Sequence, residues 1–282
     1  MDGHDLQTNA RNLDSVRTRD GVNLFCRTWG DPKGPPIVFI HSWAAHSDMW
    51  RYQMADLAER GYRCIAYDRR GHGRSGDPGH GYDTDSLADD LAQVIEAFDL
   101  AGVVLIGHSM AGGEIVRYLT RHGSGRVARI VLLAPTTPCV ARRADNPDGI
   151  DPEIFAAVRA GWRKDFHKWI GDNAAPFFVP ETPPETVRWM VDLTSSVSLD
   201  AAIACNLEMT AADFRAEMTA IDVPTLVIHG DIDASAPLEL TGRPTAALIP
   251  GARLEMYEGA PHGLFVTHME RLNADVAAFI AG

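Results

Sequence analysis

The chain is poor in cysteine: it has four among 282 residues, and no two of them form a Cys-x-x-Cys pair. A chain of this length buries enough core to fold without disulfides or a structural metal. Each cysteine lies in or beside an apolar run, which predicts buried free thiols and favours a reducing compartment. No His-Glu-x-x-His pattern and no Cys/His cluster with zinc spacing occurs, so we expect no metal. The cysteines are Cys26, Cys64, Cys139 and Cys205.

Basic charge is also scarce. Lys and Arg number 26 against 38 Asp and Glu, and the formal net charge is −12. No Lys/Arg cluster is visible, which argues against nucleic acid and anionic membranes as partners. No stretch approaches the roughly 20 apolar residues that span a bilayer, and Met1–Asp14 lacks the apolar region of a signal peptide. We therefore expect a cytoplasmic protein that acts on a small molecule, and the sequence leaves a homo-oligomer open.

Short apolar runs alternate with segments of helical periodicity along most of the chain. This order predicts an α/β fold with a mostly parallel central sheet and helices on both faces. The dipeptide Asp20-Gly21 indicates a hairpin that adds antiparallel strands at one edge. The expected strands are Ser15–Arg19, Val22–Trp29, Ile37–Ile40, Arg63–Tyr67, Val103–Ile106, Val127–Leu133, Val223–His229 and Arg253–Tyr257. The expected helices are Ser47–Arg60, with Ser47 as N-cap, Thr84–Phe98, Met110–Arg121 and Leu264–Ile280.

The alternation stops in the middle of the chain. Residues 136–220 contain no strong strand pattern but three helix-like stretches, Asp151–Trp169, Glu185–Thr194 and Leu199–Thr219. Pro-rich joints separate these stretches, and strand patterns return after them. We predict a helical cap over 136–220, inserted into a core domain made of residues 1–135 and 221–282.

A serine between small residues carries the strongest chemical signal. Ser109 follows the apolar strand Val103–Ile106 within Gly107-His108-Ser109-Met110-Ala111, and a predicted helix comes directly after it. Small neighbours permit a sharp strand-to-helix turn that exposes the hydroxyl at the end of the strand. The N–H groups of the following helix then face developing negative charge.

A serine hydroxyl is a weak nucleophile unless a histidine takes its proton and a carboxylate orients that histidine. Downstream, a strand ends in Asp231 and Asp233, and His262 lies in a loop before the last helix. The order Ser, Asp, His is the one that accompanies a serine in this type of turn. The residues by themselves leave Asp231 and Asp233 as alternatives.

Taken together, these motifs resemble the α/β-hydrolase family over nearly the whole chain, and the most similar subgroup is that of the cofactor-free haloperoxidases and arylesterases. The resemblance implies Ser109 as nucleophile, His262 as general base and, in the Gly-x-x-Asp pattern, Asp233 as the carboxylate. The stretches that carry it are Gly107–Tyr118, Asn146–Gly149, Thr210–Arg215, Ile221–Pro224 and Gly259–Gly263.

Two backbone N–H groups should stabilise the oxyanion. By position in the family pattern they are those of Met110 and Trp43, the latter in the loop after the Ile37–Ile40 strand. Two residues depart from that pattern, because Ala111 and Ser42 stand where glycines are usual. They put the geometry of the turn and of the loop in question, but not the reaction class.

A glycine-rich loop, Asp68–Ser75, resembles the family's Asp-x-x-Gly-x-Gly-x-Ser turn. It lacks the Gly-Lys-Ser/Thr ending of a phosphate-binding loop and the spacing of a dinucleotide fingerprint. We interpret it as structural and expect no cofactor.

The sequence therefore predicts a serine hydrolase of small to medium carboxylic esters, with perhydrolysis as a side activity that the resemblance suggests. Aromatic residues of the predicted cap are candidates for the pocket or for helix packing: Trp162, Phe166, Trp169, Phe177, Phe178 and Trp189. Lactone or amide hydrolysis on the same triad is the main alternative. Carbon–carbon bond hydrolysis and a ligand-binding protein with little turnover are weaker ones. A dehalogenase or epoxide hydrolase is disfavoured, because those relatives usually have Asp where Ser109 stands.

Overall fold

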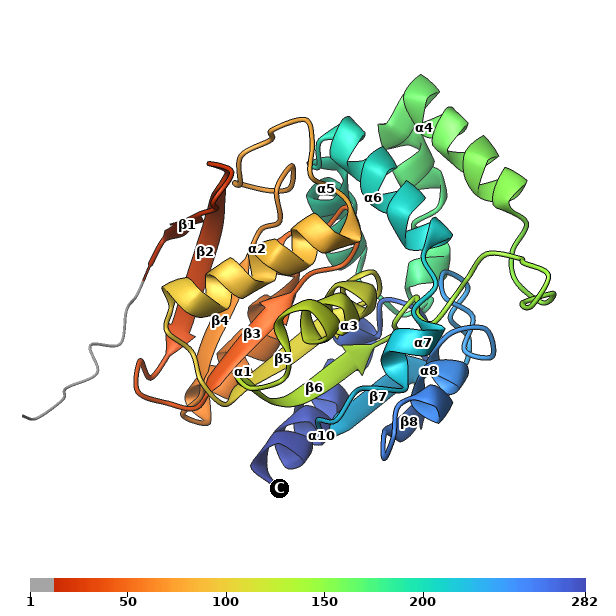
Figure 1. Cartoon of the computed structure of the whole chain (residues 1–282). Helices are drawn as coiled ribbons and strands as arrows, with labels where there is room; N and C mark the ends of the chain where they lie inside the picture. The colour runs from red at the N-terminus through yellow and green to blue at the C-terminus, as the bar shows by residue number, and fades with distance from the viewer. Residues whose placement is uncertain (1–12) are drawn as a thin grey trace, which may run out of the picture.

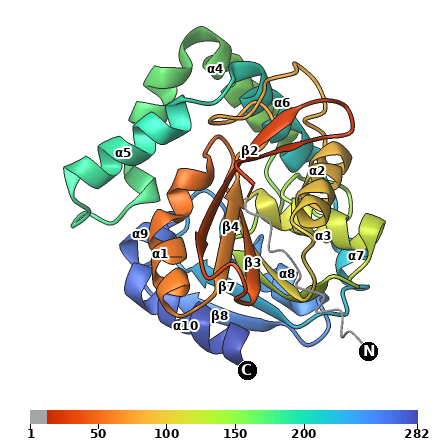
Figure 2. The same ribbon diagram turned by 90° about the vertical axis from the view of Figure 1, so that its left-hand side faces the viewer.

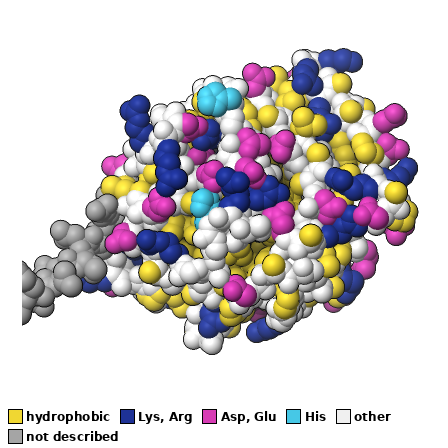
Figure 3. Space-filling view, in the orientation of Figure 1, with side chains coloured by type: hydrophobic (Ala, Val, Ile, Leu, Met, Phe, Trp, Pro, Cys, Tyr) yellow, Lys and Arg dark blue, Asp and Glu magenta, His cyan; other side chains and the backbone are white. Residues whose placement is uncertain are grey.

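The computed structural model describes residues 13–282. The interpretation of Met1–Asp14 therefore falls almost entirely outside the described residues. Within the described part, none of the helices has the length and apolar character needed to cross a bilayer. Acidic and basic side chains are interspersed on the face shown in Figure 3.

An eight-stranded sheet forms the centre of the molecule (Figure 1), with strand order β1-β2-β4-β3-β5-β6-β7-β8. β1 and β2 form the hairpin predicted around Asp20-Gly21, and β2 runs antiparallel to β4. Each remaining pair is parallel, which confirms the predicted sheet. The strands are β1 Ser15–Arg17, β2 Asn23–Gly30, β3 Pro36–Ile40, β4 Arg63–Tyr67, β5 Val103–His108, β6 Val127–Leu133, β7 Thr225–Gly230 and β8 Arg253–Tyr257.

Helices cover both faces of this sheet, as Figures 1 and 2 show. On one face lie α2 Thr84–Ala97, α3 Ala111–His122 and α8 Gly242–Leu248; on the other lie α1 Arg51–Glu59 and α10 Met269–Ala281. Every residue of β4, β5 and β7 is buried, which explains why these strands are continuous apolar runs rather than alternating ones. The parallel strands bring their carboxyl ends to one edge of the sheet.

The segment between β6 and β7 is helical. It contains α4 Pro152–Asp172, the single 3₁₀ turn η2 Ala175–Phe177, α5 Pro184–Ser195, α6 Leu199–Ala211 and α7 Arg215–Met218. α4 is kinked at Asp165, whose backbone is not helical. In Figure 1 the helices α4, α5 and α6 lie beyond the end of the sheet.

Three local predictions were wrong, and one helix was missed. The stretch Leu199–Thr219 is two helices, because Ala212 is extended and the carboxylate of Asp213 accepts the N–H of Arg215, an alternative to the helical ladder. The last helix is likewise divided at His268 into α9 Leu264–Thr267 and α10. The helix α8 was not predicted. The helix after Ser47 opens with the 3₁₀ turn η1 Ser47–Trp50, and His46, not Ser47, provides the cap.

Candidate active site

Ser109 lies on a strained turn between β5 and α3. Its φ is +59°, in the left-handed region that non-glycine residues rarely adopt. The turn is held by backbone bonds from Ser109 N–H to Leu133 O at 2.9 Å and from Gly112 N–H to Ser109 O at 3.0 Å. A strained residue that the surrounding structure holds in place is a candidate for a functional position.

The turn at Ser109 has room for the methyl group of Ala111. A Cβ at Gly107 would lie 2.9 Å from the Ala111 Cβ and 2.6 Å from Ile115 Cδ1. The missing side chain of Gly107 therefore makes room for the Ala111 methyl, so alanine is accommodated at a position where glycine is usual.

The structure brings Ser109, His262 and Asp233 together at the carboxyl edge of the sheet. His262 Nε2 lies 3.0 Å from Ser109 Oγ, and His262 Nδ1 lies 2.7 Å from Asp233 Oδ2. The carboxylate takes the Nδ1–H, which leaves Nε2 to accept the serine proton. The alternative carboxylate, Asp231, lies apart from this chain of contacts and accepts the N–H of Gly259 at 2.7 Å.

Asp233 is held as an anion. Its Oδ1 accepts the N–H groups of Ser235 and Ala236, each at 2.8 Å. Burial by itself would raise the pKa of Asp233, but the charge of His262 and the bonds from His229, His262 and Ala236 lower it far below its usual range. The carboxylate therefore stays ionised beside the imidazole.

Two further histidines, His108 and His229, support this arrangement through contacts that the sequence analysis did not predict. His108 Nε2 lies 2.9 Å from the backbone oxygen of His262, while burial lowers the pKa of His108 well below its usual value. His229, which is fully buried, places Nε2 2.7 Å from Ala236 O and 3.2 Å from Asp233 Oδ2. The neutral ring of His108 thus supports the backbone of His262, and the ring of His229 lies against the carboxylate of Asp233.

The loop after β3 carries Ser42 and Trp43. Ser42 does not adopt the left-handed region; the residue that does is Ala44, with φ +57°. Serine is therefore compatible with the backbone at position 42. Between described residues, no hydrogen bond uses the N–H of Trp43 or of Met110, so both are available as donors.

The indole of Trp43 packs on helices of segment 136–220. Its Nε1–H donates to Ala202 O at 2.8 Å, and its ring stacks on Trp162 with centroids 4.6 Å apart. Phe166 and Trp169 pack edge-on against it. These aromatic residues form a packed cluster above the loop.

Phe177 is the aromatic residue of that segment that reaches the triad. Its ring centroid lies 5.5 Å from that of His262, and its carbonyl accepts the N–H of Gly263 at 2.9 Å. By contrast, Trp189 packs against Tyr52. Ser109, Asp233 and His262 are each only 4% exposed, so these three side chains are nearly enclosed. In residues 13–282, no three His, Cys, Asp or Glu side chains are grouped so that they could hold a metal.

Comparison with known proteins agrees with this architecture. Residues 35–269 match the family model described as alpha/beta hydrolase fold. This chain belongs to the α/β-hydrolase family. The hydrolase is 38% identical to the non-heme chloroperoxidase CPO-A1 of Kitasatospora aureofaciens over 272 residues, covering 93% of this chain and 98% of that protein.

Two other relatives bear names that include ester hydrolysis. The bifunctional esterase/perhydrolase DCH of Acinetobacter calcoaceticus is 35% identical, with 94% of this chain and 98% of that protein covered. The solved structure of the esterase EaEST from Exiguobacterium antarcticum superposes with a TM-score of 0.92 at 30% identity, covering 96% of this chain and 100% of that chain. The hydrolase therefore falls in the haloperoxidase and esterase subgroup, as the sequence motifs predicted.

Proposed function

We propose that this hydrolase cleaves small to medium carboxylic esters through an acyl-enzyme on Ser109. The observation that carries the proposal is the chain of two contacts, 3.0 Å from Ser109 Oγ to His262 Nε2 and 2.7 Å from His262 Nδ1 to Asp233 Oδ2. These distances are within the range in which a base can take the proton of an attacking hydroxyl.

In the first half-reaction, His262 Nε2 takes the proton of Ser109 as Oγ attacks the ester carbonyl carbon. The N–H groups of Trp43 and Met110 donate to the oxyanion. His262 then gives the proton to the departing alcohol oxygen. In the second half-reaction the same ring deprotonates a water molecule, which attacks the acyl carbon. The ring then returns the proton to Ser109 Oγ as the bond between this oxygen and the acyl carbon breaks, which releases the acid. Asp233 orients the ring and stabilises its charged form.

A second candidate activity is perhydrolysis, in which hydrogen peroxide replaces water in the second half-reaction and gives a peracid. The name of the Acinetobacter calcoaceticus relative supports it. The burial of Ser109 and the contact of Phe177 with His262 favour small acyl groups in either reaction.

The test is the Ser109→Ala variant. We expect at least about 10⁴-fold loss of kcat on p-nitrophenyl acetate and no labelling by a fluorophosphonate, with an unchanged circular dichroism spectrum. Retention of either signal would refute the triad. A panel of esters, lactones and lactams on the unmodified enzyme, with and without hydrogen peroxide, then ranks the substrate classes; a higher kcat/KM on lactones or lactams would replace the ester assignment.

A further inference from the structure

Arg69 and Glu114 form an ion pair in the interior, beneath the loop that carries Trp43. Arg69 Nε lies 2.5 Å from Glu114 Oε2, and the two side chains are 0% and 1% exposed. Tyr67 donates its O–H to the other carboxylate oxygen. Within residues 13–282 the Arg69 Nη2 has no hydrogen-bond partner, so the guanidinium is incompletely compensated. Because desolvation offsets much of the attraction in a buried pair, stability alone gives no reason for its presence.

Arg69 also controls one backbone carbonyl, that of Ser42. Its Nη1 lies 3.3 Å from Ser42 O and 2.9 Å from His41 Nδ1. The backbone N–H of Arg69 donates to His41 Nε2 at 2.9 Å, so the ring carries its proton on Nδ1, which lies 2.8 Å from Ser42 O. Nη1 and Nδ1 are then neighbouring donors that share this oxygen, rather than partners of each other. Burial and the charge of Arg69 lower the pKa of His41 well below its usual value, which keeps the ring neutral. Both donors to Ser42 O thus depend on Arg69.

The carbonyl of Ser42 and the N–H of Trp43 belong to one peptide unit. This unit is trans, since the cis peptide bond among the described residues is Thr137–Pro138. In a trans peptide the C=O and N–H point in opposite directions, so holding the carbonyl fixes the direction of the N–H. We propose that Arg69, anchored by Glu114, is a positioning residue that aims the Trp43 N–H at the oxyanion. The proposal rests on the function proposed above for Trp43.

The carboxylate of the ion pair, Glu114, lies in the helix that follows the second proposed oxyanion donor, Met110. Glu114 lies in the first turn of α3, and Met110, whose N–H is the other proposed oxyanion donor, is the N-cap of that helix. The pair therefore connects the Ser42–Trp43 peptide to the start of α3. An oxyanion hole depends on donors held at fixed positions before the reaction begins, and this connection sets their relative placement.

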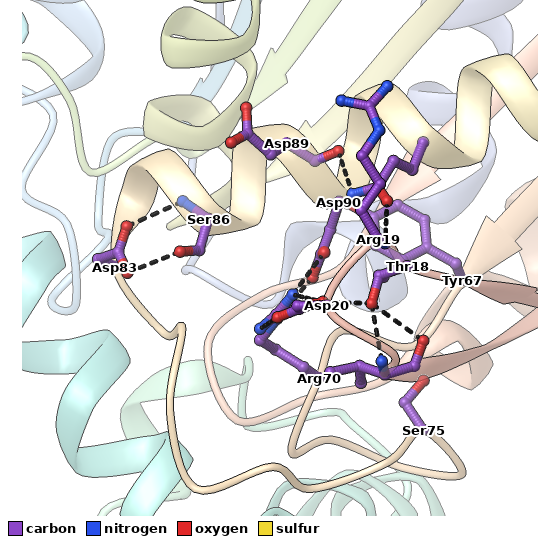
Figure 4. A network of polar contacts seen from close by, with 12 residues as sticks. Thr18, Arg19, Asp20, Tyr67, Arg70, Ser75, Asp83, Ser86, Asp89 and Asp90 are labelled. Carbon is purple, nitrogen blue, oxygen red and sulfur yellow. Dashed lines mark hydrogen bonds and ion pairs between the residues drawn. The ribbon is translucent and has the colours of Figure 1, made fainter.

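The neighbouring residue offers a matched control. Arg70 pairs with Asp90 through two contacts of 2.7 Å, and the two side chains are 3% and 2% exposed. Arg70 also contacts Asp20 of the β1–β2 hairpin at 2.8 Å (Figure 4). This pair is an equally buried Arg–carboxylate pair from the same loop, but it ties the loop to α2 and the hairpin rather than to Ser42.

The experiment compares the double variants R69M/E114Q and R70M/D90N, each of which removes both charges so that no buried ion is left unpaired. The first readouts are the melting temperature and the values of kcat and KM on a p-nitrophenyl ester. The last is the oxo-to-thiono ratio, which is kcat for that ester divided by kcat for its thiono analogue, in which sulfur replaces the carbonyl oxygen. Sulfur is a larger and weaker hydrogen-bond acceptor, so this ratio reports the oxyanion donors and is insensitive to general loosening. His41→Phe serves as a second variant, because it removes the other donor to Ser42 O and leaves the ion pair intact.

We expect R69M/E114Q to lower kcat by roughly 100-fold with little change in KM, and to reduce the oxo-to-thiono ratio by at least about 10-fold. His41→Phe should shift the ratio in the same direction, and R70M/D90N should leave it unchanged. An unchanged ratio in both R69M/E114Q and His41→Phe would overturn the proposal, as would an equal shift in R70M/D90N. If R69M/E114Q does not fold, His41→Phe against R70M/D90N decides. Residual activity of Ser109→Ala would instead overturn the proposed function itself.

Discussion

Gly230 is a sensitive point of the site, although it touches neither substrate nor the triad. It is the last residue of β7 and is buried beside the loop that carries His262. A Cβ at this position would lie 2.5 Å from the carbonyl carbon of Ala260 and closer still to its oxygen. Since carbon atoms pack at about 3.5 Å or more, Gly230→Ala must move this loop by about 1 Å. His262 lies two residues further on, and a displacement of this size costs roughly 100-fold in rate.

We therefore expect Gly230→Ala to lower kcat on p-nitrophenyl acetate by about 100-fold. Overpacking of this kind costs about 1–3 kcal/mol of stability, which for a chain of this length lowers the melting temperature by about 2–5 °C. Gly161→Ala is the matched control, because a Cβ at that position in α4 meets nothing within 4 Å; it should leave kcat unchanged and raise stability slightly. Wild-type kcat and melting temperature in Gly230→Ala would refute the reasoning.

Two other expectations follow from backbone strain and buried histidines. Ser109 has φ +59°, so glycine at this position relieves left-handed strain, and this gain exceeds the entropy cost of glycine. The melting temperature of Ser109→Gly should therefore be about 1–2 °C higher than that of Ser109→Ala. A lower melting temperature for the glycine variant would contradict this. Burial and the charge of Arg69 lower the pKa of His72 to about 4. Above pH 6.5 the ring is neutral in both the folded and the unfolded chain. As the pH falls from 6.5 toward 4, the unfolded chain binds a proton that the folded chain does not, and the free energy of unfolding decreases by at most about 3 kcal/mol. His72→Asn should therefore lose less unfolding free energy between pH 7.5 and pH 5 than the wild type does in urea titrations, and an equal loss in both proteins would contradict the assignment.

The sequence was sufficient for the features that depend on local pattern. The apolar runs of β4, β5 and β7 predicted a buried parallel sheet, and the small residues around Ser109 predicted its strand-to-helix turn. The helix α8 was not predicted because its position depends on tertiary packing. It begins at Gly242, where a Cβ would lie 2.7 Å from the ring carbon Cγ of His229. The absence of a side chain at this residue lets the helix start directly against that ring. No periodicity in the sequence reports such a contact.

The supporting residues of the site were beyond prediction for the same reason. The contact of His108 with the His262 carbonyl joins residues 154 positions apart. Arg69 and Glu114 are 45 positions apart and sit in motifs that were interpreted separately, one as a structural loop and one as part of the serine turn. Chemistry at a single position is visible in a sequence, whereas support from a distant side chain becomes visible only in the fold.

The helical segment leaves the sheet at the carboxyl end of β6, after Leu133, and re-enters it at the amino end of the neighbouring parallel strand β7, where Thr225 is paired with Ile130. The sheet thus fixes the positions of both ends of the segment, whatever lies between them. Closing a longer or shorter loop between fixed ends changes the free energy slowly, by about 0.6 kcal/mol for each doubling of length. A foreign segment grafted at these strands would have to recreate the contacts with the core, among them Phe177 O to Gly263 N, Ala202 O to Trp43 Nε1 and Ser198 N to Gly71 O. We therefore expect that this segment can be exchanged while the residues on the sheet stay in position.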